Sequence, residues 1–129
     1  MQNILVVDDD RTYRTIMARA LSRAGFDVSQ AASGTAVLER LQTKPPAAVV
    51  TDIQMPDIDG LELIRTIRST GHRIAIIAVS GGNPSLDLLR AASLYGADAA
   101  LRKPLDLARL VAVVQSLLTE NPNWTPAPN

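Results

Sequence analysis

The chain has 129 residues, which suits a single domain with a core of its own. Hydrophobic residues make up 47% of it and charged residues 20%, a composition that excludes a disordered or fibrous chain. The formal net charge is +0, so no overall basic field attracts nucleic acid, and the absence of cysteine excludes disulfides, thiolate zinc sites and a cysteine nucleophile.

Apolar runs and helical patterns alternate from the N-terminus onward. Residues 4–7 are continuously apolar, as expected for a strand buried on both faces of a parallel sheet. The spacing after them predicts a helix that Asp10 caps and Gly25 ends. The stripe that this helix is expected to bury consists of Tyr13, Ile16, Met17, Ala20, Leu21 and Ala24.

The same strand–helix unit recurs along the rest of the chain. Further strands are predicted at residues 26–31, 47–51, 74–79 and 97–101. Further helices are predicted at residues 33–41, from Asp59 onward, from Asn83 and Pro84 to Tyr95, and at 105–118. This alternation predicts an α/β fold with a parallel sheet, in one domain over residues 1–119. Residues 120–129, rich in Pro and Asn, are expected to form a tail or the start of a linker.

Polar residues follow four of the predicted strands, at the sheet edge where open parallel sheets bind ligands. In chain order they are Asp8 and Asp9, then Asp52, then Ser80, then Lys103 with Pro104. Taken singly, each has an ordinary explanation, since Asp and Ser at strand ends are common turn or cap residues. Asp57 and Asp59 fit that explanation well. The joint pattern favours a functional site instead.

The chemistry of that site follows from its charges. Crowded carboxylates repel one another unless a cation neutralises them, and Asp oxygens with room for water suit Mg²⁺. Ser80 is placed to donate a hydrogen bond to a phosphoryl group, and Lys103 to supply a positive charge. Because Asp8 and Asp9 look like metal holders, Asp52 is the best candidate for a nucleophile that forms an aspartyl phosphate.

Four segments carry a resemblance to a known family. They are ILVVDDD at residues 4–10, TDIQMPDIDG at 51–60, VSG at 79–81 and KP at 103–104. Together they resemble a response-regulator receiver domain of two-component signal transduction, of the single-domain, chemotaxis-regulator type. The resemblance spans residues 3–119. It implies the flavodoxin-like (βα)₅ three-layer sandwich, with a parallel five-stranded sheet of order 2-1-3-4-5.

The resemblance also implies a role for each site residue. Asp52 would be the phosphoacceptor. Mg²⁺ would be bound by Asp9, Asp52 and the backbone carbonyl of Gln54, with Asp8 acting through water. The phosphoryl group would be bound by Ser80, Gly81 and Lys103, and the peptide bond before Pro104 is usually cis in this family.

The sequence departs from the family pattern in two places. Many receivers carry a switch aromatic three residues before the lysine, and here that position is Ala100. The aromatic half of the usual switch is therefore absent. Ser80 replaces the more common Thr. Gly81 and Gly82 follow it, and their conformational freedom predicts a mobile loop before the next helix.

The resemblance implies a signalling domain that acts on protein partners, not an ordinary enzyme that turns over a substrate. The phosphoryl donor would be a histidine kinase or a histidine phosphotransfer protein. The output would be a downstream protein target or a homodimer, formed through the fourth helix, fifth strand and fifth helix. Arg11 and Arg14 are either a docking surface for the donor or a solvated cationic face. Val113 and Leu117, off the expected stripe of the last helix, are either an association patch or an ordinary exposed pair.

Three other functions fit the sequence less well. A phosphohydrolase with an aspartate nucleophile needs an acid two residues later, where Gln54 stands. In a flavodoxin-type cofactor binder, Asp8, Asp9 and Asp10 would repel the phosphate. A scaffold without phosphorylation leaves the complete acid–hydroxyl–lysine set unexplained. No apolar run approaches the ~18 residues of a membrane helix, and no nucleic-acid motif is present, so we expect a cytoplasmic protein that binds neither membrane nor nucleic acid.

Overall fold

The computed structural model describes residues 2–81 and 88–119. Its strands are β1 (Asn3–Val7), β2 (Asp27–Ala31), β3 (Ala48–Asp52), β4 (Ala75–Ser80) and β5 (Ala99–Arg102). Its helices are α1 (Arg11–Arg23), α2 (Gly34–Thr43), α3 (Gly60–Ser69), α4 (Leu88–Tyr95) and α5 (Leu107–Thr119). Strands and helices alternate throughout, as predicted.

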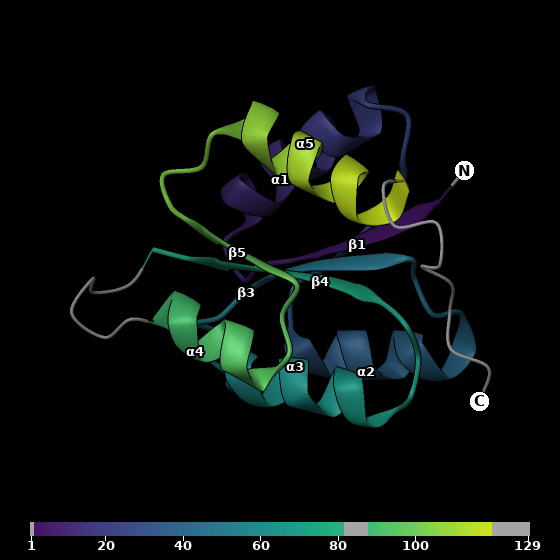
Figure 1. The fold of residues 1–129 in the computed structure, drawn as a ribbon, viewed down its shortest axis with the longest axis vertical. Coiled ribbons are helices and arrows are strands. Elements are labelled where there is room, and N and C mark those ends of the chain that lie inside the picture. Colours follow the sequence, from purple (N-terminus) through teal and green to yellow (C-terminus); the bar gives the residue numbers. More distant parts are fainter. Residues whose placement is uncertain (1, 82–87, 120–129) are drawn as a thin grey trace.

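The strands form one parallel sheet in the order β2-β1-β3-β4-β5. Figure 1 shows α1 and α5 on one face of this sheet and α2, α3 and α4 on the other. The predicted α/β three-layer sandwich is therefore confirmed. The register pairs Asp52 with Val79 and Ser80 with Arg102, so the polar ends of β3, β4 and β5 meet at one edge.

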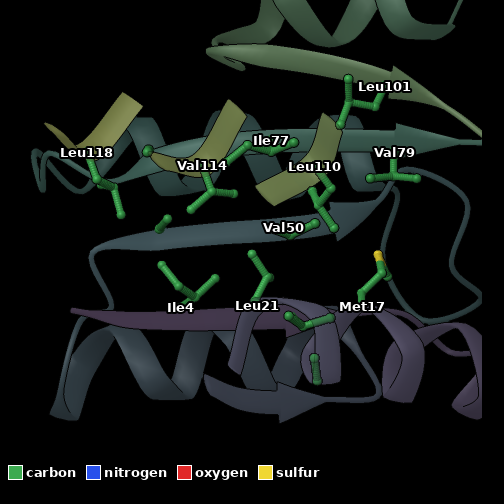
Figure 2. Close-up of a cluster of buried hydrophobic side chains, with 14 residues drawn as sticks. Ile4, Met17, Leu21, Val50, Ile77, Val79, Leu101, Leu110, Val114 and Leu118 are labelled. Carbon is green, nitrogen blue, oxygen red and sulfur yellow. The ribbon is translucent and has the colours of Figure 1, made fainter. Parts of the chain in front are cut away.

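Two hydrophobic cores lie on opposite faces of the sheet. Side chains alternate along β1, so Ile4 and Val6 join the core under α1 and α5, whereas Leu5 and Val7 join the core over α2, α3 and α4. Figure 2 shows the first core, where side chains from both helices meet the strands: Ile4, Met17, Leu21, Val50, Ile77, Leu110 and Val114. Every residue of β3 and β4 is buried, which explains why both strands are apolar until the polar residues at their carboxyl ends.

Side chains at the helix ends fix where the helices begin. Asp10 accepts hydrogen bonds from the backbone nitrogens of Thr12 and Tyr13 at 2.9 and 3.3 Å, and so caps α1 as predicted. Asp59 caps α3 through Leu61 in the same way. Such caps typically stabilise a fold by about 1 kcal/mol each. Gly25, with φ of +100°, ends α1 as predicted.

The structure corrects some local predictions. Ile16 was expected to be buried in the α1 stripe, but its side chain is 44% exposed, because the buried face of α1 instead runs through Met17, Ala18 and Leu21. Val113 and Leu117 are not exposed, since both pack, partly buried, against the core under α1 and α5.

Strand β5 begins at Ala99 rather than 97. Just before it, the Asp98 carboxylate accepts a hydrogen bond from the backbone nitrogen of Ile76 at 2.8 Å. Three predictions lie outside the described residues: the helix start at Asn83 and Pro84, the loop at Gly82, and the tail at 120–129. Among the described residues, no helix is long and apolar enough to cross a membrane.

Candidate functional site

Three carboxylates gather where β1 and β3 end. Asp8 directly follows β1 and is fully buried, and Asp9 beside it is exposed. Asp52 is the last residue of β3 and only 6% exposed. Each offers an oxygen, and these oxygens lie within 4.8 Å of one another. The structure therefore brings together the three aspartates that the sequence placed at these strand ends.

Lys103 lies opposite this cluster. Its Nζ is 3.1 Å from Oδ2 of Asp8 and 3.4 Å from Oδ2 of Asp52, so one ammonium bridges both buried carboxylates. The backbone holds it there, because the Lys103 nitrogen donates to the Ser80 carbonyl at 2.9 Å and continues the pairing of β5 with β4. The peptide bond between Lys103 and Pro104 is cis.

Burial and charge act against each other on Asp52 and Lys103. Burial raises the pKa of Asp52, and the Asp8 charge raises it further, while the Gln54 backbone N–H and the Lys103 ammonium pull it down without fully offsetting this. Burial alone would lower the pKa of Lys103, but its hydrogen bond to Asp8 and the charges of both aspartates outweigh burial and raise the pKa. The ammonium form is therefore favoured.

Ser80 and Gly81 border the lysine on the β4 side. Ser80 ends β4 and is 4% exposed. A Cβ at Gly81 would stand 3.1 Å from Cδ of Lys103 and 3.2 Å from its Cβ, closer than side chains normally approach. The backbone at Gly81 therefore packs closely against the aliphatic part of the Lys103 side chain.

Gln54 lies in the loop between β3 and α3. Its backbone nitrogen donates to Oδ1 of Asp52 at 3.1 Å, which orients that carboxylate. The base of the loop is closed by a bond from the Gly60 nitrogen to the Ile53 carbonyl at 2.9 Å. A Cβ on Gly60 would overlap the Ile53 backbone, so only glycine allows this approach.

Asp57 and Asp59 stay outside the acidic cluster. Asp59 caps α3. The carboxylate of Asp57 accepts bonds from the backbone nitrogens of Gly34 and Thr35 at 3.2 and 3.0 Å and from the Thr35 hydroxyl at 2.9 Å. The bond from the Thr35 N–H is the largest of the effects that lower the Asp57 pKa.

Sequence reasoning missed two residues that support the site. Tyr13 was assigned to the core stripe, yet Nζ of Lys103 lies 4.2 Å from its ring centroid. Arg14 is partly buried rather than solvated, and it donates to the Asp8 carbonyl at 2.8 Å and to Gln30 at 3.2 Å. The contact of Tyr13 joins residues distant in sequence, and that of Arg14 with Asp8 depends on how α1 is oriented after β1, so the helical spacing alone did not indicate either.

The donor set suits a hard divalent cation. All the side chains of the cluster offer carboxylate oxygens, the ligands that Mg²⁺ prefers. Three carboxylates face one ammonium, which leaves an excess of negative charge in a largely buried site. Asp9 is exposed and so reachable from solvent. A bound cation would relieve the repulsion that contributes to the raised pKa of Asp52.

Comparison with known proteins identifies the family. The sequence matches the model of the response regulator receiver domain over residues 4–115. The chain belongs to this family. Receiver domains are phosphorylation-switched signalling domains rather than classical enzymes, and they bind Mg²⁺ at an acidic pocket. Membership of the receiver-domain family favours a phosphorylation-switched signalling role over a phosphohydrolase or a flavodoxin-type cofactor binder.

Curated proteins that are similar in sequence to this chain are response regulators as well. The response regulator MprA of Mycobacterium sp. (strain KMS) is 41% identical over 116 residues, covering 89% of this chain and 50% of that protein. MprA of Mycobacterium avium (strain 104) is 40% identical over the same length. This receiver domain therefore spans about half the length of the curated relatives that it matches.

Solved receiver structures share the fold. A CheY-like receiver domain protein from Methanospirillum hungatei JF-1 has a TM-score of 0.85 at 28% identity, covering 93% of this chain and 95% of that one. The BeF3-activated DrrB receiver domain has a TM-score of 0.83 at 26% identity, covering 92% and 97%.

Proposed function

We propose that this receiver accepts a phosphoryl group on Asp52 from a histidine kinase or a histidine phosphotransfer protein. The observation that carries the proposal is the placement of Lys103 between Asp8 and Asp52, next to the cluster that Asp9 completes. A carboxylate flanked by an ammonium and by oxygen ligands for a cation is equipped to react with a phosphoryl group.

The transfer is a displacement at phosphorus. A carboxylate oxygen of Asp52 attacks the phosphoryl group of the donor, and the new O–P bond forms as the P–N bond to the donor histidine breaks. The imidazole nitrogen keeps the electron pair of that bond and takes up a proton. Asp52 must be ionised to attack, and the Gln54 backbone N–H and Lys103 both favour that form.

Mg²⁺ would be bound by side-chain oxygens of Asp9 and Asp52 and by the carbonyl of Gln54, with Asp8 acting through water. A bound cation of this kind supplies positive charge that screens the phosphoryl oxygens from the carboxylates. Asp8 is also held by the backbone nitrogen of Asp10, which donates to its Oδ1 at 2.9 Å. This bond leaves Oδ2 of Asp8 facing Lys103.

Ser80 and Lys103 would bind the transferred group. A phosphoryl group adds roughly two negative charges and three acceptor oxygens. The Lys103 ammonium already lies 3.4 Å from Oδ2 of Asp52, and the Ser80 side chain ends the neighbouring strand. Movement of these two groups toward the phosphoryl oxygens would shift the segment after β4, which Gly81 begins.

The signal would leave through α4, β5 and α5, toward a downstream protein or a second receiver. Helix α4 carries exposed apolar side chains, with Leu94 79% and Tyr95 37% exposed. Ala100, at the usual aromatic position of β5, is partly buried and packs against the core over α2, α3 and α4. The switch in this chain would therefore work without an aromatic residue at that position. We place the signalling in the cytoplasm, where histidine kinases transfer their phosphoryl groups.

Incubation with acetyl phosphate and Mg²⁺, read by intact mass, tests the acceptor. We expect a gain of about 80 Da, the mass of one phosphoryl group, in the wild type and in Asp57→Asn. Asp57 is the matched control because it is an exposed carboxylate of the same loop that bonds α2 instead of the cluster. The gain should disappear in Asp52→Asn. A gain that survives this substitution would reassign the acceptor.

A further inference from the structure

Tyr13, in the first turn of α1, contacts the β5–α5 connection at two points. Nζ of Lys103 lies 4.2 Å from the centroid of its ring. Its hydroxyl accepts a hydrogen bond from the backbone nitrogen of Leu105 at 2.9 Å. One side chain thus holds both the ammonium of Lys103 and the backbone just beyond Pro104.

These contacts restrict a side chain that is otherwise flexible. A lysine has a four-carbon stem and many rotamers, so its ammonium is precise only where several groups confine it. The Lys103 ammonium is in contact with Asp8, with Asp52 and with the face of the Tyr13 ring. Gly81 packs against the stem. The ring face attracts the cation without a charge of its own and therefore adds nothing to the repulsion among the carboxylates.

We propose that Tyr13 is a positioning residue of this receiver. Its ring face holds the ammonium of Lys103 beside Asp52, and its hydroxyl fixes the backbone that follows the lysine. The inference rests on the proposed function, in which Lys103 binds the phosphoryl group. Tyr13 places an aromatic ring from α1 next to that lysine. In this chain β5 has Ala100 at the position where many receivers have an aromatic residue.

A purely structural role for Tyr13 is the competing explanation, because the side chain is partly buried and packs against the core under α1 and α5. Two substitutions separate the roles. Tyr13→Leu keeps an apolar side chain for packing but removes the ring and the hydroxyl. Tyr13→Phe keeps the ring and removes only the hydroxyl that binds Leu105.

The position of Lys103 can be read directly by NMR. The sequence has only two lysines, Lys44 and Lys103, and Lys44 is exposed, so selective ¹³C-lysine labelling gives one probe and one internal reference. We expect the ε-methylene protons of Lys103 to be shifted upfield of those of Lys44 by the ring current in the wild type and in Tyr13→Phe. In Tyr13→Leu the two signals should nearly coincide. In Tyr13→Phe the Leu105 amide should exchange faster.

Phosphorylation by acetyl phosphate with Mg²⁺ supplies the functional readout. We expect Tyr13→Leu to be phosphorylated roughly three- to thirtyfold more slowly than the wild type, the range that loss of a cation–π contact gives. Tyr13→Phe should stay within about threefold. Phe26→Leu, which removes an aromatic ring that packs, partly buried, against the same core as Tyr13, is the control and should match the wild type.

Coincident Lys44 and Lys103 signals in the wild type would overturn the inference without any variant. Unchanged Lys103 signals, or an unchanged rate, in folded Tyr13→Leu would overturn it as well. Failure of the proposed function has a different signature, because the wild type would then gain no phosphoryl group, or Asp52→Asn would still gain one, while the NMR comparison would remain readable.

Discussion

Asp57 and Thr35 join the loop after β3 to the start of α2. Oδ2 of Asp57 accepts from both the backbone nitrogen and the hydroxyl of Thr35, at 3.0 and 2.9 Å, across 22 positions of sequence. The loop that this bond fixes also carries Gln54, whose nitrogen orients Asp52. The Asp57 contact thus anchors the far end of that loop to α2.

The Asp57 contact predicts a pH dependence of stability. Because the bond from the Thr35 N–H lowers the Asp57 pKa below its ordinary value of 3.8, the ionised carboxylate stabilises the fold above that value. This contribution is lost as the pH falls through the lower folded-state pKa. As the pH falls below about 4, the unfolding free energy of the wild type should therefore fall more steeply than that of Asp57→Asn. Denaturant titrations that give parallel pH curves would contradict this account.

Gly60→Ala tests the closure of the same loop. Its new Cβ would overlap the backbone of Ile53, so we expect a loss of about 2–4 kcal/mol in unfolding free energy. Gly25→Ala is the matched control, because that site has open space and only a φ of +100° to oppose a side chain. It should lose about 1–2 kcal/mol. Equal losses in urea unfolding would show that the close approach at Gly60 is not the cause.

Arg68 ties α3 to the segment between α4 and β5. Its guanidinium donates to the carbonyls of Gly96 and Ile74 at 2.8 and 2.7 Å and pairs with Asp98 at 2.6 Å. Arg68→Ala should lose about 2 kcal/mol of unfolding free energy. It should also speed hydrogen exchange in β5.

Arg65 on the same helix is the control for Arg68. Its pair with Glu62, at 3.6 Å, joins two largely exposed side chains. Arg65→Ala should therefore change the unfolding free energy by less than about 0.5 kcal/mol. Equal effects of the two substitutions would mean that the bonds to Gly96 and Asp98 do not hold this part of the fold.

The acidic cluster should cost stability when no cation is bound. Asp52 is buried beside Asp8, and burial is the main reason that its pKa is raised. In EDTA near neutral pH, Asp52→Asn should be more stable than the wild type by about 1–2 kcal/mol. Added Mg²⁺ should stabilise the wild type and narrow the difference. A wild type that is more stable than Asp52→Asn in EDTA would contradict the charge argument.

Local patterns in the sequence predicted most of the fold and the members of the cluster. Continuous apolar runs marked β1, β3 and β4 because these strands are buried on both faces. Asp8, Asp52 and Lys103 were placed together because the carboxyl ends of parallel strands share one edge. Asp10 was recognised as a cap because its partners are its immediate neighbours.

Contacts between distant residues escaped prediction. Asp57 lies in a segment typical of a turn, and nothing near it in sequence indicates its hydrogen bonds to Thr35. Tyr13 follows the helical spacing of α1, but its contact with Lys103 depends on how α1 packs beside β5. Ile16 follows the same spacing but is exposed, because the face of α1 that packs on the core runs through Met17, Ala18 and Leu21.

A crystal structure of the protein with Mn²⁺ and beryllium trifluoride tests the central claim most directly. We predict an anomalous peak among Asp8, Asp9, Asp52 and the carbonyl of Gln54, beryllium trifluoride bonded to Asp52, and the Lys103 ammonium in contact with a fluorine. Beryllium trifluoride on another carboxylate, or a cation bound away from these aspartates with Lys103 turned from the site, would contradict the account.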